Sequence, residues 1–261
     1  MSLLRGFLQF AENVGYQVRL LIAVLARLGH VGKRRMQIAS QLYGAGNKVL
    51  HVALLVSFVM GMVISLQTGL VLAEYGQQDQ IGTVVAITMA REMGPFITAI
   101  ILAATVASAM AAELGTMSVS DELAALEVLS VDRTSYLTMP RVLAMAVMAP
   151  LLTIFSDAVG IVGGAFVARS QLGVGITLYY DTAIEALQAP AAMIALPKDV
   201  YGGLLKALVF GVTIAVIACA TGLRTRGGAL GVGNATRNAV RDSIIAIIVT
   251  DYFLNWLFYQ S

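Results

Sequence analysis

Five long apolar segments constrain this chain more than any other feature of its sequence. A helix needs about 20 apolar residues to cross the hydrocarbon core of a bilayer. The chain is 58% hydrophobic and 12% charged, whereas a soluble domain carries about 25% charged residues. The sequence therefore predicts an all-α polytopic membrane protein with five transmembrane helices. We expect them near 48–73, 82–112, 141–168, 200–222 and 239–259.

The basic side chains predict how these helices are oriented. Cytoplasmic loops of membrane proteins carry an excess of Lys and Arg. Here most basic residues lie before the first segment and in the loops between segments two and three and between four and five. The opposite loops, 74–81 and 170–197, contain none. We therefore expect a cytoplasmic N-terminus and a C-terminus on the outer side.

Residues 1–40 are predicted to form a separate, cytoplasmic-side interfacial segment, and residues 41–261 the five-helix transmembrane domain. Apolar residues recur at helical spacing near the N-terminus, with polar residues between them, which is typical of a helix lying in the membrane interface. A signal peptide is the alternative, because LLIAVLA at 20–26 is strongly apolar. RLGHVGKRR follows it instead of a small-residue cleavage site, which favours the interfacial helix.

Small residues recur at four-residue spacing within the predicted spans. Gly61, Ser65 and Gly69 form one such row, and Gly160 and Gly164 form another. Small side chains let helix backbones approach closely inside a membrane. We interpret these rows mainly as packing surfaces within the chain, although a homodimer interface would use the same kind of face.

Arg91 and Glu92 are the least expected residues in the second apolar segment. Neighbours on a helix point about 100° apart, so each side chain needs its own partner. Gly94 and Pro95 follow at once and can distort the helix. The predicted topology puts the pair towards the outer end of the span, at a depth comparable to that of Lys206. Two interpretations stay open: snorkelling to the interface, or a polar pocket that contacts substrate and includes Lys206.

Other candidates for chemistry are weaker. Asp157 and Asp251 lie in different spans, and two carboxylates that share a proton form an aspartyl-protease site. Their contexts, FSDAVG and VTDYFL, do not support that hypothesis, so we favour structural roles. Cys219 is interpreted as a small core residue. His30 and His51 are isolated from other metal-ligating residues, so no metal site is predicted.

Neither glycine-rich stretch is predicted to bind a nucleotide. In GHVGKRR, at 29–35, a phosphate-binding loop would need a glycine where Arg27 stands and Ser or Thr where Arg34 stands. GGALGVGNATR, at 227–237, follows no predicted strand. We expect no cofactor in this chain, so any ATP would be bound by a partner subunit. The net charge of +2 gives no reason to expect nucleic acid.

The loop after the second span predicts a docking element for a soluble partner. Ser118 and Asp121 have the spacing of a capping box that opens a short helix. Three leucines mark one face of that helix, and acidic residues surround them: Leu123, Leu126 and Leu129, with Asp121, Glu122, Glu127 and Asp132. A solvated connector is the alternative. The acidic character favours docking, because this cytoplasmic loop would otherwise be expected to be basic.

Several motifs, in order from about residue 40 to the C-terminus, together resemble the MlaE-type permease family, the membrane subunits of MCE-associated ABC lipid transporters. They read GMVISLQTGLVL, AREMGP, ASAMAAELGTM, DELAALEVLSVD, LTMPRVLA, GIVGGAFVA and GLLKALVFG. The resemblance implies an N-terminal interfacial helix followed by five transmembrane helices, in a homodimer. It also implies two ABC ATPase subunits on the cytoplasmic face, a ring of MCE-domain proteins on the periplasmic face, and phospholipid as substrate.

The resemblance also implies which residues have which roles. Lipid would bind in an outward-open cavity lined by Ile64, Gln67, Val71, Leu72, Tyr75, Arg91, Glu92 and Lys206. The loop 113–132 would be the coupling helix that docks on the ATPase, through Glu113, Asp121, Glu122, Leu126, Glu127 and Asp132. The chain would have no catalytic residues of its own.

The resulting prediction is a permease subunit of an ABC transporter in the inner membrane of a Gram-negative-type bacterium. It would move phospholipids between the inner and outer membranes and so serve outer-membrane lipid asymmetry. The rival hypothesis is a proton-coupled secondary transporter that uses Glu92, Asp157, Asp251 and Lys206. Five spans without a detectable inverted repeat make that rival weaker.

Overall fold

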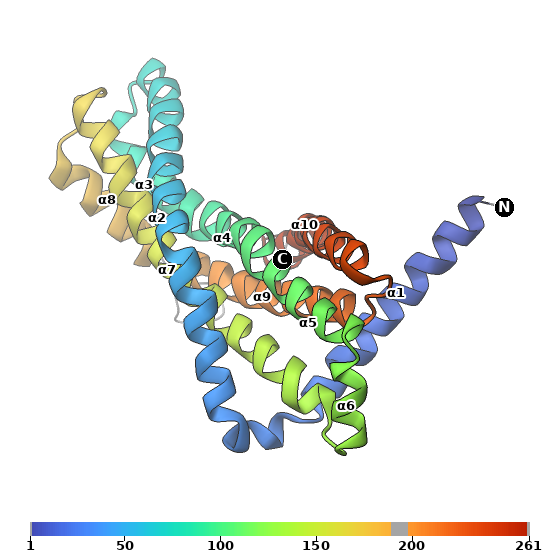
Figure 1. Cartoon of the computed structure of the whole chain (residues 1–261). Coiled ribbons are helices and arrows are strands. Elements are labelled where there is room, and N and C mark those ends of the chain that lie inside the picture. The colour runs from blue at the N-terminus through green and yellow to red at the C-terminus, as the bar shows by residue number, and fades with distance from the viewer. Residues whose placement is uncertain (1, 189–197, 260–261) are drawn as a thin grey trace. The chain divides into compact units, whose positions relative to one another are not determined.

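The computed structural model describes residues 2–188 and 198–259, and every regular element in these two ranges is a helix (Figure 1). The predicted all-α fold class is confirmed. The predicted outer loop 170–197 is described only as far as Gln188, because its remainder lies outside the described residues.

The helices follow one another with short connections, and π-helical turns interrupt several of them. In chain order they are α1 (Ser2–Leu25), η1 (Leu28–Arg34), α2 (Arg35–Glu74), η2 (Gln78–Gln80), α3 (Ile81–Thr88), η3 (Met89–Met93), α4 (Gly94–Leu102), η4 (Ala103–Ala107), α5 (Ser108–Val119), α6 (Glu122–Val128), η5 (Thr134–Thr138), α7 (Met139–Ser170), α8 (Ile176–Gln188), α9 (Lys198–Leu223) and α10 (Gly228–Tyr259).

Among the residues that the structure describes, four helical runs are long and apolar enough to cross a membrane. They are Arg35–Glu74, Gln78–Val119, Thr134–Ser170 and Lys198–Leu223. Four of the five predicted spans lie within them. The predicted fifth span lies in α10, where Arg241, Asp242 and Asp251 interrupt the apolar side chains. The count of five spans therefore stays a prediction.

The chain divides into two compact units, and the unit boundaries fall inside the long helices. The first unit comprises Met1–Ala45, Leu102–Val147 and Gly211–Val249. Its core joins α1, α5, α6, η5 and α9 through Leu20, Leu114, Leu123, Leu137 and Cys219. The buried guanidinium of Arg141 is held by Glu113, at 2.9 Å, and by the Leu137 carbonyl, at 2.7 Å.

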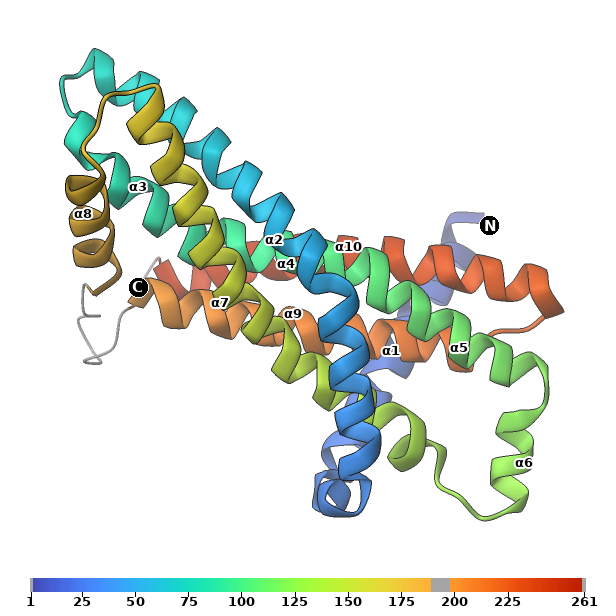
Figure 2. The same ribbon diagram turned by 60° about the vertical axis from the view of Figure 1, so that its left-hand side comes forward.

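The second unit comprises Gly46–Ile101, Met148–Phe210 and Thr250–Ser261. Its core includes Ile81, Val85 and Met89, with Ala165 and Ala168 of α7 and the buried Tyr179 of α8. Helix α8 lies along α3 (Figures 1 and 2). The Tyr179 hydroxyl donates a hydrogen bond to the Ile161 carbonyl of α7, at 3.1 Å, which ties the short helix α8 to a long one.

The small-residue rows do act within the chain, as predicted. A Cβ atom on Gly61 would lie 1.8 Å from the carbonyl oxygen of Gly160, and one on Gly163 would lie 2.2 Å from that of Phe58. Helices α2 and α7 therefore meet backbone to backbone in the second unit. Side chains larger than hydrogen would force them apart.

Replacing Gly61 with alanine tests this packing. We expect Gly61→Ala to lower the free energy of unfolding by about 1–3 kcal/mol, because the added methyl group has no space. Gly44→Ala, on the same helix, is the matched control, since nothing lies within 4 Å of its added Cβ. It should be neutral or stabilising by up to about 1 kcal/mol. Equal melting temperatures in detergent for the two variants would contradict the close approach.

Candidate functional site

The site is built on a wide helical turn in the second unit. Residues Met89–Met93 form a π-helical turn, in which the Gly94 backbone N–H donates to the Met89 carbonyl, five residues back. Such single turns are frequently found at functional sites. A Cβ on Gly94 would lie 1.6 Å from Asp157 Oδ1 of α7, and one on Gly203 of α9 would lie 1.9 Å from the Ala90 carbonyl oxygen. Because neither glycine has a side chain, α7 can approach the turn at Gly94, and α9 can approach it at Gly203.

Pro95 affects the hydrogen bonding of a carbonyl group in this turn. Proline has no backbone N–H, so the carbonyl of Arg91, four residues earlier, lacks the donor that a regular α-helix provides. The Lys206 ammonium donates to that carbonyl at 3.1 Å. The distortion predicted from the Gly-Pro pair thus has a structural consequence: the Arg91 carbonyl accepts a hydrogen bond from the buried Lys206 ammonium.

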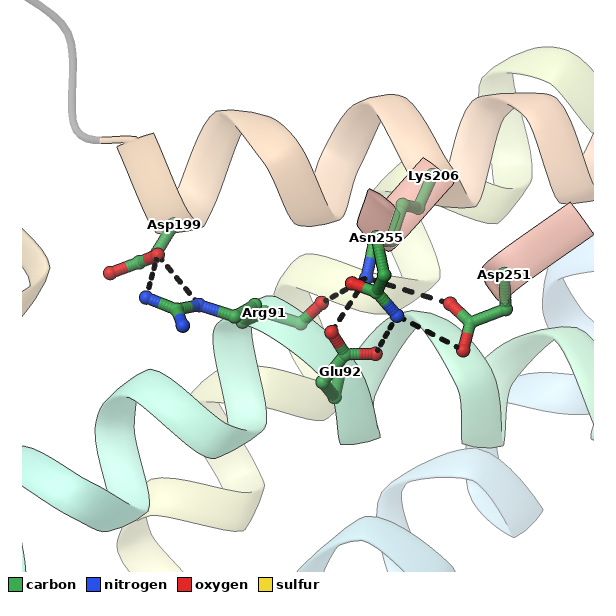
Figure 3. Close-up of polar contacts among 6 residues, drawn as sticks. All are labelled: Arg91, Glu92, Asp199, Lys206, Asp251 and Asn255. Carbon is green, nitrogen blue, oxygen red and sulfur yellow. Dashed lines mark hydrogen bonds and ion pairs between the residues drawn. The ribbon is translucent and has the colours of Figure 1, made fainter. Parts of the chain in front are cut away.

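Lys206 is completely buried, and its surroundings match the chemistry of an ammonium group (Figure 3). Its three N–H groups meet three acceptors. Besides the Arg91 carbonyl, these are Glu92 Oε1 at 2.7 Å and Asn255 Oδ1 at 2.5 Å. Asp251 Oδ1 lies 3.5 Å away and adds a second carboxylate. A charge is tolerated in such a place only when it is paired and hydrogen-bonded in this way.

Asn255 links the two carboxylates that face Lys206. Its amide nitrogen donates to Glu92 Oε2 at 3.1 Å and to Asp251 Oδ2 at 3.4 Å, while its oxygen accepts from Lys206 (Figure 3). One amide therefore fixes the orientation of both acidic side chains. The partners come from η3, α9 and α10, so the network joins three helices of the second unit.

Arg91 pairs separately with Asp199, in the first turn of α9. Its Nε and Nη2 atoms lie 2.9 Å and 2.7 Å from Asp199 Oδ1. The prediction that neighbours Arg91 and Glu92 need different partners is confirmed: Arg91 pairs with Asp199, and Glu92 pairs with Lys206. We name these residues the charged network: Arg91, Glu92, Asp199, Lys206, Asp251 and Asn255. It contains two cations and three carboxylates.

The predicted lipid-binding residues of α2 form a separate surface in the same unit. Gln67, Val71 and Tyr75 recur every four residues and are exposed. Gln67 and Val71 share one open face of α2, and Tyr75 follows directly after the end of that helix. Ile64 and Leu72 instead pack against the core around Met89. The structure therefore brings Arg91, Glu92 and Lys206 together. For the α2 residues it shows a partly exposed apolar face, and their contact with lipid stays a prediction.

Sequence reasoning missed Asp199 and Asn255. Asp199 lies just after the predicted outer loop and gave no intramembrane signal, although an acidic residue in the first turn of a helix is favoured. Asn255 is neutral and was not counted among charged residues. Its spacing of four residues from Asp251 places both on one helix face, and that was the available signal.

The predicted coupling residues lie in the first unit, and several already have partners within the chain. Glu113 pairs with Arg141, Glu127 pairs with Arg133, and Asp132 pairs with Arg27. Burial alone would raise the pKa of Asp132, but hydrogen bonds from Arg27 and from backbone N–H groups outweigh it and lower that pKa. Asp132 therefore stays ionised at neutral pH. Asp121 and Glu122 are exposed, and Leu126 packs against the core.

The capping-box prediction was wrong. Ser118 lies inside α5 and its hydroxyl donates to the Thr225 carbonyl at 3.0 Å, so it caps nothing. Asp121 stands at the N-cap of α6 in a left-handed conformation, with φ 59°, and makes no side-chain cap. The prediction that three leucines mark one face of this helix was also partly wrong. Leu123 is buried, but α6 ends at Val128, which leaves Leu129 beyond the helix and exposed.

Asp157 and Asp251 have different neighbours. Asp157 lies against Gly94, whereas Asp251 belongs to the charged network with Lys206 and Asn255. These contacts give no support to an aspartyl-protease pair. Cys219 is buried in the core of the first unit, as predicted.

Removing the buried cation tests the charged network. We expect Lys206→Met to lower the free energy of unfolding by about 3–5 kcal/mol, because Glu92 and Asp251 would face each other without Lys206 between them. Adding Glu92→Gln should recover part of that loss, since one of the two carboxylates is then neutral. Thermal unfolding in detergent measures both variants. Strictly additive losses would mean that Lys206 and Glu92 do not interact.

Comparison with known proteins gives a family. The model of the Permease MlaE family matches residues 38–257. A probable ABC transporter permease protein of Synechocystis sp. is 38% identical over 233 residues, which cover 89% of this chain and 85% of that protein. One of Rickettsia prowazekii is 35% identical over 223 residues, which cover 85% of this chain and 83% of that protein.

A plant protein is equally similar. The chloroplastic protein TRIGALACTOSYLDIACYLGLYCEROL 1 of Arabidopsis thaliana is 38% identical over 221 residues, or 85% of this chain and 61% of that longer protein. The matched residues include the whole charged network and both predicted site regions. This chain is a multi-pass membrane protein that belongs to the MlaE permease family, whose relatives are named as ABC transporter permeases.

Proposed function

We propose that this chain is the membrane subunit of an ABC transporter that moves phospholipids between the inner and outer membranes. In this proposal it works as a homodimer in the inner membrane, with its N-terminus in the cytoplasm and its C-terminus in the periplasm. Two ABC ATPase subunits hydrolyse ATP on the cytoplasmic face, and a ring of MCE-domain proteins receives or delivers lipid on the other. The permease itself contributes no catalytic residue and binds no cofactor.

The charged network is the observation that carries the lipid proposal. A phospholipid has a charged headgroup and long apolar tails, so its site must offer both kinds of surface. In the second unit, Arg91 and Glu92 keep 36% and 27% of their side-chain surface exposed, although both are ion-paired. Val71, exposed on α2, and Tyr75, exposed just after its end, offer apolar surface in the same unit. Headgroup contact at the network and tail contact along α2 fit this division.

The name of one relative supports a lipid substrate. The Arabidopsis protein is named after trigalactosyldiacylglycerol, a glycolipid. A diacylglycerol body is common to that lipid and to phospholipids, whereas the headgroups differ. The shared diacylglycerol body agrees with a site whose apolar surface accepts the acyl chains of either lipid.

Coupling to ATP hydrolysis is proposed to run through α6. This helix is short, exposed and acidic, and Leu123 and Leu126 anchor it to the core of the first unit. A movement of α6 would therefore be transmitted to α5, which continues into the helical run that carries Arg91 and Glu92. Closure of the ATPase pair would in this way change the spacing of the two α2 helices of the dimer and expel lipid from the cavity.

A proton-coupled secondary transporter is the rival, because acidic residues inside a membrane protein are typical of proton relays. Glu92, Asp251 and Lys206 have that arrangement. The family match favours the ABC permease, since its relatives are named as such. Transport that requires ATP and persists when the proton gradient is collapsed would exclude the rival.

Lipid binding predicts a loss when the partly exposed pair is removed. We expect Arg91→Ala/Glu92→Ala to retain about tenfold less phospholipid, which corresponds to about 1.4 kcal/mol of binding free energy. Asp181→Ala/Glu185→Ala is the matched control, since both residues are exposed on α8 of the same unit. Mass spectrometry of lipid extracted from equal amounts of monodisperse protein measures retention. Equal retention by both variants would leave Arg91 and Glu92 as interfacial charges without a role in binding.

Docking through α6 predicts a specific loss of the ATPase. Glu122→Lys/Glu127→Lys should abolish co-purification of the ATPase subunit while the permease still inserts at normal levels. Glu185→Lys on α8 is the control, because it reverses an exposed charge on the predicted opposite side of the membrane. A pull-down from solubilised membranes gives the result. Normal ATPase recovery with the double variant would show that α6 is only a connector.

A further inference from the structure

A polar cavity lies in the first unit, and neither the charged network nor α6 contributes to it. It is formed by α1, the end of α9 and the first half of α10, and has a volume of about 360 Å³. Ligand pockets are commonly about 300–1,000 Å³. Its lining is mainly polar and includes Asn13, Gln17, Arg224, Arg226, Asn238 and Arg241.

The charges in this cavity are not balanced. Arg224 pairs with Glu12 at 2.6 Å and donates to Asn13 Oδ1 at 2.8 Å. Arg241 pairs with Asp242 at 2.8 Å. Arg226 makes no ion pair or side-chain hydrogen bond with any residue that the structure describes. One guanidinium, with up to five N–H donors, is therefore available beside two arginines that are already compensated.

The backbone around Arg226 holds the loop against the helix that follows it. Gly227 and Gly228 have φ of +90° and +64°, which other residues rarely adopt. A Cβ on Gly231 would lie 1.9 Å from the Arg226 carbonyl oxygen, so only glycine lets α10 pack against this loop. Gly231 itself lines the cavity in the first turn of α10, where the helix dipole favours anions.

Helix α1, which lines the cavity, also has an apolar face that no described residue covers. Val14, Val18, Ile22 and Leu25 are exposed on α1 at spacings of four, four and three residues, so they share one side of the helix. An exposed apolar stripe on an amphipathic helix is the feature that binds a membrane surface. The same helix supplies Asn13 and Gln17 to the cavity. A membrane surface bound by α1 would therefore place lipid headgroups near the cavity.

We propose that this cavity binds the phosphate of an anionic phospholipid headgroup, with Arg226 as its principal cation. Basic pockets beside membrane helices are known to hold such headgroups. The side chains of Asn238 and Gln17 line the cavity. They make no hydrogen bond with any described residue and are available to bind the glycerol or phosphate oxygens. The bound lipid would fix α1 to the start of α10. This site is independent of the transported lipid and of the proposed function.

Short-chain lipids added to the purified full-length protein test the proposal. Native mass spectrometry would compare dioctanoyl phosphatidylglycerol, dioctanoyl phosphatidylcholine and inorganic phosphate. We expect phosphatidylglycerol to bind more tightly than phosphatidylcholine. Arg226→Gln should weaken that binding about fivefold, since one basic residue near anionic lipid contributes about 1 kcal/mol. Arg226 is exposed, so its replacement should not impair folding.

Arg237→Gln is the matched control, because Arg237 lies on α10, the helix that follows the Arg226 loop, is exposed and does not line the cavity. It should leave phosphatidylglycerol binding unchanged. Equal weakening by both variants would show non-specific attraction to basic residues and overturn the proposal. Inorganic phosphate that binds as tightly as phosphatidylglycerol and displaces it would also overturn it, in favour of a soluble anion. If Arg226→Gln bound phosphatidylglycerol with unchanged affinity, the proposed role of Arg226 would be contradicted.

Discussion

The second unit depends on how the ammonium of Lys206 is buried. An uncompensated charge in that position would cost several kcal/mol, yet Lys206 is completely enclosed. Glu92, Asp251 and Asn255 compensate it, together with the carbonyl that Pro95 leaves without a donor. Because these groups come from η3, α9 and α10, the three helices are held in register by one cation. The wide turn at Met89–Met93 carries Glu92 and the Arg91 carbonyl, and Gly94 and Gly203 let α7 and α9 approach it.

This arrangement makes the charged network suitable for binding as well as for folding. Lys206 is inaccessible, so it organises Glu92 and Asp251 without itself meeting a ligand. Arg91 and Glu92 remain partly exposed at the edge of the network. An amphiphile could contact these two groups while the buried ion pairs keep their geometry. The exposed side chains of Val71, on α2, and of Tyr75, just after its end, give the acyl tails apolar surface in the same unit.

Much of this could be predicted from the sequence, because charged residues are rare in apolar segments. The need of Arg91 and Glu92 for separate partners follows from helix geometry alone, and Lys206 was predicted to lie at a comparable depth. Asp199 and Asn255 escaped notice, because one follows a loop and the other is uncharged. The capping box predicted from the local sequence at Ser118 was wrong, because the Ser118 hydroxyl instead donates a tertiary hydrogen bond to the Thr225 carbonyl. Propensity rules describe isolated helices and do not include such contacts.

The central claim is that the second unit holds a phospholipid along α2 with its headgroup at Arg91 and Glu92. Photocrosslinking in detergent solution, with no lipid added, tests it directly, since only lipid retained in the protein can react. A benzoylphenylalanine in place of Val71 should yield a phospholipid adduct that is lost in Arg91→Ala/Glu92→Ala. The same group in place of Leu55, also exposed on α2, should yield none. Equal adducts at the two positions, or none at Val71, would contradict the account.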